Sequence, residues 1–333
     1  MPHGKRSKAS PRTDAATRRV ETGQKTGPTT ASAPPRDDAV PALAARSPNV
    51  HKGDVGRVAI FAGSRGMSGA ALLCASGALR GGAGLVRVLT AASVQSTIAA
   101  GEPCCMSQSL NEDDSGRIDR PDENIVRESL EWADVVAVGP GLGQSPTLGR
   151  LVADIVRQAP RPCVIDADGL NNLAQVAEWW RRNSKVPRVL TPHPGEMRRL
   201  LDSAGRADIE IGRTDESRIA AAHALSRLAD AIVILKGHRT VVCAPHAAYV
   251  NQTGNAGMAT GGMGDVLTGL IAALIGQKMS PFDASRLAVH VHGAAADRLA
   301  KHLAPVGYLA REVADAIPAA LSEHVDRPRF GFR

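Results

Sequence analysis

The chain has 333 residues, of which 43% are hydrophobic and only 3% aromatic, so we expect a core packed from alanine and branched aliphatic side chains. The net charge of +7 lies mostly near the start, because residues 1–50 hold nine Lys or Arg against four Asp or Glu and the remainder holds 31 against 29. The nearly neutral remainder lacks the basic stripe of a nucleic-acid-binding protein. The sequence also contains no run of eighteen apolar residues, so no membrane span is predicted.

Residues 1–48 are predicted to be a disordered basic extension. They contain mainly Pro, Ser, Thr, Ala, Arg and Gly, with no aromatic residue and no sustained periodicity. Such a composition cannot bury enough apolar surface to offset the entropy lost on ordering. A tail that binds an acidic partner is the alternative interpretation.

From residue 57 onward short apolar runs alternate with helical patterns, which predicts one α/β domain over residues 49–325. Six segments are each expected to begin with a strand, and a hairpin is expected over residues 240–251. The six segments are residues 57–63, 84–90, 134–138, 162–171, 188–201 and 231–237. Helices are expected over residues 70–82, 146–158, 220–229 and 281–300, with others ending at 180 and starting near 265. The β–loop–α–β order favours a mostly parallel sheet between two helical layers.

The loops that follow these strands carry the unusual residues of the chain. They read GSRGMSG, GPGLG, DADGLN, TPHPGE, LKGHR and, before the last long apolar run, GGMGD. In open α/β sheets, ligands bind outside the carboxyl ends of the strands. Six such loops at one edge therefore predict a single composite site.

Asp265 stands where the glycine-rich part of residues 251–276 meets an apolar helix. Free N–H groups at the start of a helix attract anions, and glycine lets the backbone approach a ligand closely. A phosphoryl group held on these amides, with Asp265 taking a proton from an attacking hydroxyl, would suit phosphoryl transfer. An ordinary helix N-cap is the alternative role of Asp265.

Five further polar residues could serve the same site. Lys236 follows a strand and could reach a nucleotide phosphate, although a lysine in an exposed turn is the alternative. His193, held between two prolines, suits ligand contact or a structural hydrogen bond, and Glu196 suits a helix cap or a water-mediated magnesium contact. Asp166 and Asp168 suit ligand or magnesium orientation, or stabilisation of their own turn.

The five cysteines are odd in number and lack CxxC spacing, so we expect free thiols in a reducing cytoplasm. No zinc pattern is present, and no direct protein ligand to a metal is expected. The start of the chain lacks the apolar segment of a secretory signal, which also favours a cytoplasmic location.

In order along the chain, HKGDVGRVAIFAGSRGMSGAALL, GPGLG, DADGLN, TPHPGEMRRL, LKGHRT and NAGMATGGMGDVLTGLIAAL resemble the ADP-dependent NAD(P)H-hydrate dehydratase family. The resemblance covers roughly residues 51–318 and implies a ribokinase-like α/β/α fold. It implies a stand-alone dehydratase, because 48 low-complexity residues cannot hold the epimerase domain that often precedes it. Met263 departs from the family, where a polar residue is usual, and this puts a side-chain contact to phosphate in doubt.

The resemblance also implies a reaction, in which the S-epimer of hydrated NADH or NADPH is phosphorylated by ADP and then loses phosphate, giving NAD(P)H and AMP. Asp265 would be the base, with ADP or ATP as donor and Mg²⁺ as counter-ion to the phosphates. A homo-oligomer, often a tetramer, and a separate epimerase are the implied partners. The implied substrate contacts are Ala71, Gly141, His193 and Asp265, and the implied nucleotide contacts are Lys236, Gly237, His238, Arg239, Thr240 and Gly264.

Two other functions stay open on the residues alone. One is a small-molecule kinase of the same fold, acting on a vitamin precursor or sugar alcohol, which would leave a stable phosphorylated product. The other is a silent nucleotide-binding protein, against which the presence of both Asp265 and Lys236 argues, because a protein that only binds needs no base beside the phosphate. GSRGMSG lacks the GxGxxG spacing of a Rossmann dehydrogenase, so an oxidoreductase is not expected.

Overall fold

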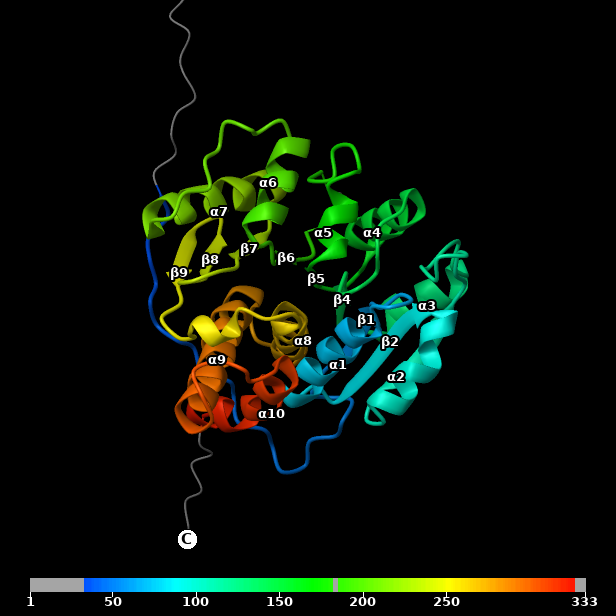
Figure 1. Cartoon of the computed structure of the whole chain (residues 1–333), viewed down its shortest axis with the longest axis horizontal. Coiled ribbons are helices and arrows are strands. Elements are labelled where there is room, and N and C mark those ends of the chain that lie inside the picture. The colour runs from blue at the N-terminus through cyan, green and yellow to red at the C-terminus, as the bar shows by residue number, and fades with distance from the viewer. Residues whose placement is uncertain (1–32, 182–184, 327–333) are drawn as a thin grey trace, which may run out of the picture. The chain divides into compact units, whose positions relative to one another are not determined.

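The computed structural model describes residues 33–181 and 185–326 of the chain. In this part, nine strands form a sheet of order β3-β2-β1-β4-β5-β6-β7-β8-β9 (Figure 1). The strands are β1 Arg57–Phe61, β2 Leu85–Ala91, β3 Met106–Leu110, β4 Val135–Val138, β5 Cys163–Ile165, β6 Arg188–Leu190, β7 Ile232–Leu235, β8 Val241–Ala244 and β9 Ala247–Val250.

Strands β1 to β7 pair in parallel, and only the last two strands run antiparallel to their neighbours. The central strands β4 to β7 are buried along their whole length, as strands covered on both faces must be. The parallel sheet and the closing hairpin were both expected from the sequence, and both are confirmed.

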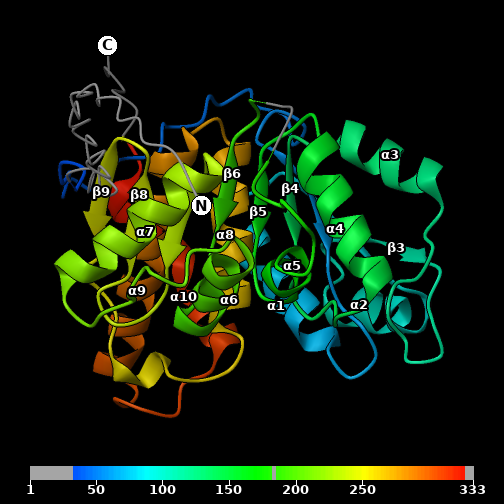
Figure 2. The same cartoon turned by 90° about the horizontal axis from the view of Figure 1, so that it is seen from above.

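Two layers of helices cover the sheet. Figures 1 and 2 show α1, α8, α9 and α10 together on one face and α4, α5, α6 and α7 on the other. The helices are α1 Ser68–Arg80, α2 Gln95–Gly101, α3 Glu123–Trp132, α4 Pro146–Gln158, α5 Asp168–Leu173, α6 Pro194–Ser203, α7 Asp215–Ala229, α8 Met263–Gly276, α9 Pro281–His302 and α10 Ala310–Leu321. The three-layer α/β/α fold expected from the sequence is therefore present.

Local signals explain where several helices begin. Helix α4 matches its predicted bounds, since Ser145 caps it through a 3.1 Å bond from the Leu148 N–H and Pro146 occupies the first turn. Helix α5 ends at Leu173 and not at Trp180, so the prediction there was wrong. Trp179 is nevertheless buried, and its indole N–H donates to the Ser203 hydroxyl. The apolar residues that suggested a longer helix therefore belong to a turn that packs against the fold.

Helix α8 begins at Met263, two residues before the predicted start. Gly262 adopts φ +91° ahead of it, a left-handed conformation that glycine tolerates, and thereby turns the chain into the helix. Asp265 consequently lies in the first helical turn and is not the N-cap, so the alternative N-cap role does not hold.

Helices α1 and α8 cross at backbone contact. A Cβ on Gly77 of α1 would lie 2.2 Å from the Val266 carbonyl oxygen, and a Cβ on Gly269 of α8 would lie 1.9 Å from the Cys74 carbonyl oxygen. Only glycine fits at these two positions. The helix that carries Asp265 is thus fixed against its neighbour.

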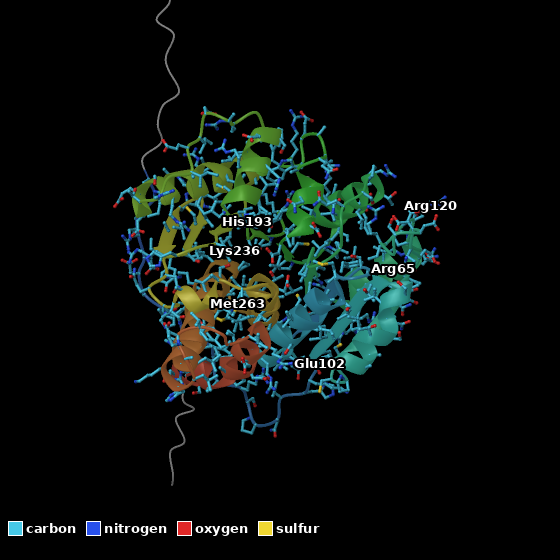
Figure 3. The ribbon with its side chains drawn as sticks, in the orientation of Figure 1. Arg65, Glu102, Arg120, His193, Lys236 and Met263 are labelled. Carbon is cyan, nitrogen blue, oxygen red and sulfur yellow. The ribbon has the colours of Figure 1, made fainter. Side chains whose placement is uncertain are left out.

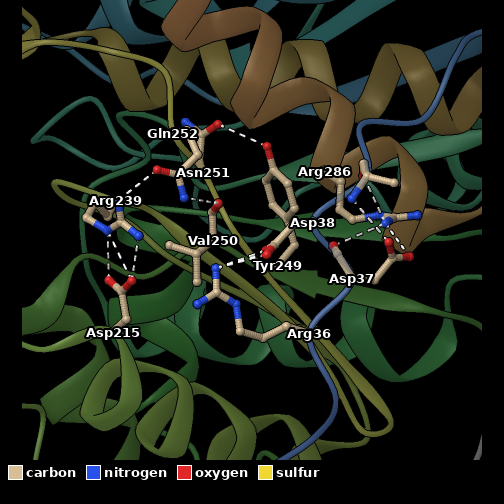
Figure 4. A network of polar contacts seen from close by, with 11 residues as sticks. Arg36, Asp37, Asp38, Asp215, Arg239, Tyr249, Val250, Asn251, Gln252 and Arg286 are labelled. Carbon is tan, nitrogen blue, oxygen red and sulfur yellow. Dashed lines mark hydrogen bonds and ion pairs between the residues drawn. The ribbon is translucent and has the colours of Figure 1, made fainter.

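The predicted disorder of residues 1–48 does not hold for residues 33–48; residues 1–32 lie outside the described part of the chain. Residues 35–43, which we call the strap, pass the edge of β9 at residues 35–37 (Figure 4) and continue to the residues that follow α10. Arg36 forms a parallel bridge with Ala248, Asp37 pairs with the buried Arg286, and Leu43 bridges Val325. Composition did not reveal these contacts because they involve partners more than 200 residues away.

The sequence patterns also missed β3, α2, α3 and α10. All five cysteines are free, and three of them are buried. Among the described residues, no helix combines the length and apolar character needed to span a bilayer.

Candidate active site

The loops after β1, β4, β5, β6 and β7 meet at the carboxyl edge of the sheet. The Ser64 hydroxyl donates to the Gly141 carbonyl over 2.8 Å, and the Gly63 N–H donates to the Pro140 carbonyl. Lys236 after β7 donates its N–H to Pro192 after β6, and its ammonium group reaches Asp166 after β5. These bonds join the strand-end loops into one site, as the sequence predicted.

Asp166 is the most enclosed carboxylate of the site, with a residue exposure of 1%. It accepts from Lys236 Nζ at 2.5 Å, from the Thr191 hydroxyl at 2.6 Å and from the Thr268 hydroxyl at 2.8 Å. The Lys236 charge and these bonds hold the pKa of Asp166 below its usual value despite burial. Asp166 therefore carries a negative charge that ties β5, β7 and α8 together.

His193 and Glu196 form a reciprocal cap at the start of α6. Nδ1 of His193 accepts from the Gly195 N–H at 2.9 Å, and the Glu196 carboxylate accepts from the His193 N–H at 2.8 Å. Glu196 is buried and lies 3.7 Å from Lys236 Nζ, while half of the His193 side chain is exposed. The capping role holds for Glu196, and His193 keeps an exposed ring edge for a ligand.

Asp265 projects from the first turn of α8 near this cluster. Burial raises its pKa to about 7, and the neighbouring charge of Asp166 adds to the rise more than the positive charge of Lys236 opposes it. Within the described residues, its carboxylate makes no hydrogen bond or ion pair. A carboxylate with these properties is suited to accept a proton near neutral pH.

A cavity of about 690 Å³ opens beside Lys236 and the start of α8. All six predicted nucleotide contacts line it: Lys236, Gly237, His238, Arg239, Thr240 and Gly264. Figure 3 shows His193, Lys236 and Met263 close together, and all three belong to its wall. The opposite wall comes from residues 251–260 and from α9.

Gly264, which has no side chain, lies directly over the charged groups of Lys236 and Asp166. A Cβ at this position would lie 3.3 Å from Lys236 Nζ and 3.6 Å from Asp166 Oδ2, so the backbone passes close over both groups. Met263, which replaces the expected polar residue, is only 7% exposed, and its thioether offers no N–H or O–H donor. A phosphate at this end would be bound by backbone amides of the first helical turn.

Arg239 adopts φ +54° and is held in place by two partners. Its guanidinium donates to both oxygens of Asp215, at distances from 2.6 to 3.1 Å, and to Gln252 Oε1 at 2.7 Å (Figure 4). The fork geometry fixes the orientation of the guanidinium at the cavity wall. Sequence spacing gave no sign of Asp215 as its partner.

Three of the four predicted substrate contacts, Ala71, Gly141 and Asp265, lie outside the cavity lining. Ala71 is fully buried in α1, and Gly141 is buried at φ +61°, where a Cβ would lie 2.7 Å from the Met67 carbonyl oxygen. Asp168 bonds to the Gly143 N–H at 2.9 Å and to the Gln144 side chain, so it shapes the GPGLG loop.

In residues 33–181 and 185–326, no group of three His, Cys, Asp or Glu side chains is placed to hold a metal ion. The oxygens of Asp166 accept three protein hydrogen bonds, and Glu196 is a second buried carboxylate beside the lysine, 3.7 Å from its Nζ.

Comparison with known proteins gives consistent matches. The sequence profile of the family described as NAD(P)H-hydrate dehydratase matches residues 58–319. The bifunctional NAD(P)H-hydrate repair enzymes Nnr of Moorella thermoacetica and Escherichia coli are each 40% identical, over 84% and 85% of this chain and 52% and 51% of their own lengths. The chain thus spans about half the length of these curated relatives.

Solved structures agree with the fold. The ADP/ATP-dependent NAD(P)H-hydrate dehydratase of Bacillus subtilis, co-crystallised with ATP and Mg²⁺, is 29% identical with a TM-score of 0.69, covering 85% of this chain and 95% of that one. A ribokinase-like superfamily protein of Enterococcus faecalis is 26% identical with a TM-score of 0.71, covering 85% and 93%.

Proposed function

Since this chain belongs to the NAD(P)H-hydrate dehydratase family, we propose that it dehydrates the S-epimer of hydrated NADH or NADPH, using ADP as phosphoryl donor. The observation that carries this proposal is the position of Asp265, one residue beyond the cavity-lining Gly264 and beside the Lys236–Asp166 pair. A base next to an anion-binding helix start is what transfer of a phosphoryl group to a hydroxyl requires.

In the proposed reaction, the C6 hydroxyl of the hydrate attacks the β-phosphorus of ADP, and Asp265 takes the hydroxyl proton. The bond between the β-phosphorus and the oxygen of AMP breaks, which releases AMP. The lone pair of the ring nitrogen then expels phosphate from C6, and loss of a proton from C5 restores the dihydronicotinamide. Hydroxide is a poor leaving group, and phosphorylation removes that obstacle.

The residues of the cavity divide the remaining work. We propose that Lys236 and Arg239 neutralise nucleotide phosphates, while the amides at the start of α8 hold the transferred group. His193 and Asp265 would face the hydrate, together with the backbone near Ala71 and Gly141. Lys236 is positioned by Asp166 and Glu196, whose carboxylates also raise the pKa of its ammonium group against the effect of burial.

Mg²⁺ fits this site as an ion that arrives with the nucleotide. Magnesium is usually held by one or two carboxylates, water and substrate phosphates, and Glu196 is the carboxylate that would face it. When bound, the ion would supply charge neutralisation on the phosphates.

Further proposals rest on the family resemblance. They are a homotetramer, a cytoplasmic location, and an epimerase acting as a separate protein to supply the S-epimer. Free cysteines at all five positions are consistent with a reducing compartment.

The decisive experiment incubates the chain with purified hydrated NADH or NADPH, Mg²⁺ and either ADP or ATP. We expect the absorbance of the reduced nicotinamide to return, with one AMP and one phosphate released per turnover with ADP. A stable phosphorylated product without that absorbance would instead identify a small-molecule kinase. Binding of ADP with no phosphate release would identify a silent nucleotide-binding protein.

A further inference from the structure

The wall of the cavity formed by residues 251–260 has no helix or strand longer than one 3₁₀ turn, and it is held in place by side chains. We propose that Asp297 of α9 and Asn255 of this wall form a positioning pair that sets the affinity for the adenine nucleotide without taking part in the chemistry. This inference rests on the proposed function, because it takes the nucleotide to be the occupant of the cavity.

The pair forms a closed hydrogen-bond network. Asp297 accepts from the Gly254 N–H and from Asn255 Nδ2, each over 2.8 Å. Asn255 Oδ1 accepts in turn from the Gly257 N–H at 3.0 Å and from the Tyr308 hydroxyl at 2.6 Å. Four hydrogen bonds thus connect the two side chains with the wall and with Tyr308.

The backbone around this network is closely packed at two glycines. A Cβ on Gly257 would lie 2.4 Å from the Pro305 carbonyl oxygen and 2.7 Å from the Tyr308 hydroxyl. On the other side, a Cβ on Gly293 of α9 would lie 2.3 Å from the Thr253 hydroxyl. The wall is therefore seated on α9 and on the loop before α10 at backbone distance.

A second set of bonds anchors the start of the wall to the same helix. Asn251 Nδ2 donates to the Val289 carbonyl at 3.2 Å, and the Thr253 hydroxyl donates to the His290 carbonyl at 2.8 Å. These two anchors fix the first residues of the wall, so loss of the Asp297 pair would release only the part from Gly254 onward. That part supplies most of the cavity lining on this side.

The location of the pair separates it from the reacting atoms. Gly254 and Asn255 line the cavity, whereas Asp297 does not and acts through them. Neither Asn255 nor Asp297 bonds to Asp265, Lys236 or Asp166 among the described contacts. Replacing Asp297, which lies outside the cavity lining, should therefore raise the dissociation constant and KM for ADP while leaving kcat at saturating ADP unchanged.

The direction of each bond allows a rescue experiment. In Asp297→Asn, one accepting oxygen becomes an amide donor, which must face another donor, either the Asn255 amide or the Gly254 N–H. A flip of the Asn255 amide would not remove the conflict, because it would turn the Asn255 donor toward the Gly257 N–H. In Asn255→Asp, two carboxylates would face each other. In the variant that combines both substitutions, the new amide at position 297 could donate to the new carboxylate at position 255 and still accept from the Gly254 N–H. The carboxylate at position 255 would keep both of its donors, so all four bonds return with the same total charge.

We would measure the dissociation constant of ADP with Mg²⁺ by calorimetry, and KM and kcat with hydrated NADH, in the two single variants and in the combined variant, which we call the exchange. Each single variant should bind ADP about tenfold more weakly, the effect of one hydrogen bond to a charged group, and the exchange should recover most of this loss. Tyr308→Phe should give a smaller loss in the same direction. Asp154→Asn, on the exposed face of α4, is the matched control.

Wild-type affinity in both single variants, or an exchange that binds no better than they do, would overturn the inference. If the single variants do not fold, recovery of folding and ADP affinity by the exchange supports the pairing, and its failure rejects it. If the wild type binds ADP but regenerates no NAD(P)H, the proposed function fails and the calorimetric comparison still decides the inference. Absence of ADP binding by the wild type would overturn both.

Discussion

The two ends of the candidate site differ in the contacts that hold their residues. At the base end, Asp265 stands on α8, whose backbone touches α1 at Gly77 and Gly269. At the nucleotide end, residues 251–260 also lie at backbone distance from α9, at Gly293, and carry side-chain hydrogen bonds to that helix. Close backbone contact thus occurs at both ends, and side-chain hydrogen bonds add to it only in the wall that recognises the nucleotide, whereas the other end holds the proposed base. Variants at the two ends should therefore differ in which kinetic parameter they change.

The largest effect is expected from Asp265→Asn. Removing a general base typically lowers the rate by two to four powers of ten, so we expect about a thousandfold loss of kcat, or ~4 kcal/mol in the barrier. ADP affinity should stay the same, because Asp265 does not line the cavity. Stopped assays of NADH recovery and calorimetry with ADP test the two parts, with Asp154→Asn as control. An active Asp265→Asn variant would exclude Asp265 as the base.

The pH dependence of the wild type gives the next largest effect. The base must be deprotonated, and burial raises the pKa of Asp265 to about 7. We therefore expect kcat/KM to fall about tenfold per pH unit below pH 7, and so about a hundredfold between pH 7 and 5, with a plateau above. Initial rates from pH 5 to 9 at fixed ionic strength measure this. A profile that stays flat down to pH 5 would contradict it.

Gly269→Ala should show how far the base end depends on close helix contact. The added Cβ would lie 1.9 Å from the Cys74 carbonyl oxygen, so α1 and α8 must separate, and overpacking of this kind costs about 1–3 kcal/mol. The variant should lose unfolding free energy and kcat together, unlike the variants of the nucleotide wall. Gly69→Ala, where the new Cβ meets nothing within 4 Å, is the stability control for urea unfolding. Equal stability of the two variants would show that α8 tolerates displacement.

The last effect concerns the stability cost of a buried base. The folded-state pKa of Asp265 lies near 7 and its ordinary value is 3.8, so between these values the folded state binds more protons than the unfolded state. Stability contributed by this group therefore falls as pH rises from about 4 to 7. Asp265→Asn, which lacks the charge, should gain Tm relative to wild type more at pH 8 than at pH 4. Thermal scans at both values test the sign of this difference.

Much of the fold followed from local sequence signals. The strand runs ending at Phe61, Val138 and Leu235 are short, apolar and followed by glycine or polar residues, and Ser145-Pro146 marks the start of α4. These features depend only on near neighbours in the chain. Strand β3, with the sequence MSQSL, lies at the sheet edge and is only partly buried, so it lacks the apolar run that identifies a strand.

The sequence indicated residues of the cavity wall but not the groups that hold them. Lys236 and Gly264 were expected at a nucleotide, and both line the cavity. The pairing of Lys236 with Asp166 spans 70 residues, and that of Asn255 with Asp297 spans 42. No pattern in a single sequence links such positions, because the sheet order and the seating of the loop on α9 bring them together. The sequence therefore indicated candidate residues, and the fold was needed to identify the residues that position them.

The strap has a consequence for the order in which the chain can be completed. Its contacts are to Ala248, to Arg286, and to the backbone of His324 and Val325. A ribosome adds ~5–20 residues per second, so residues near position 40 exist for roughly 15 to 60 s before their last partners are made. During synthesis the Leu43 end of the strap therefore lacks its partners until residues 324–325 emerge, and complete docking of the strap belongs to the final stage of folding. Pulse-labelling of nascent chains would follow this interval as late protection of the Leu43 amide, which donates to the His324 carbonyl.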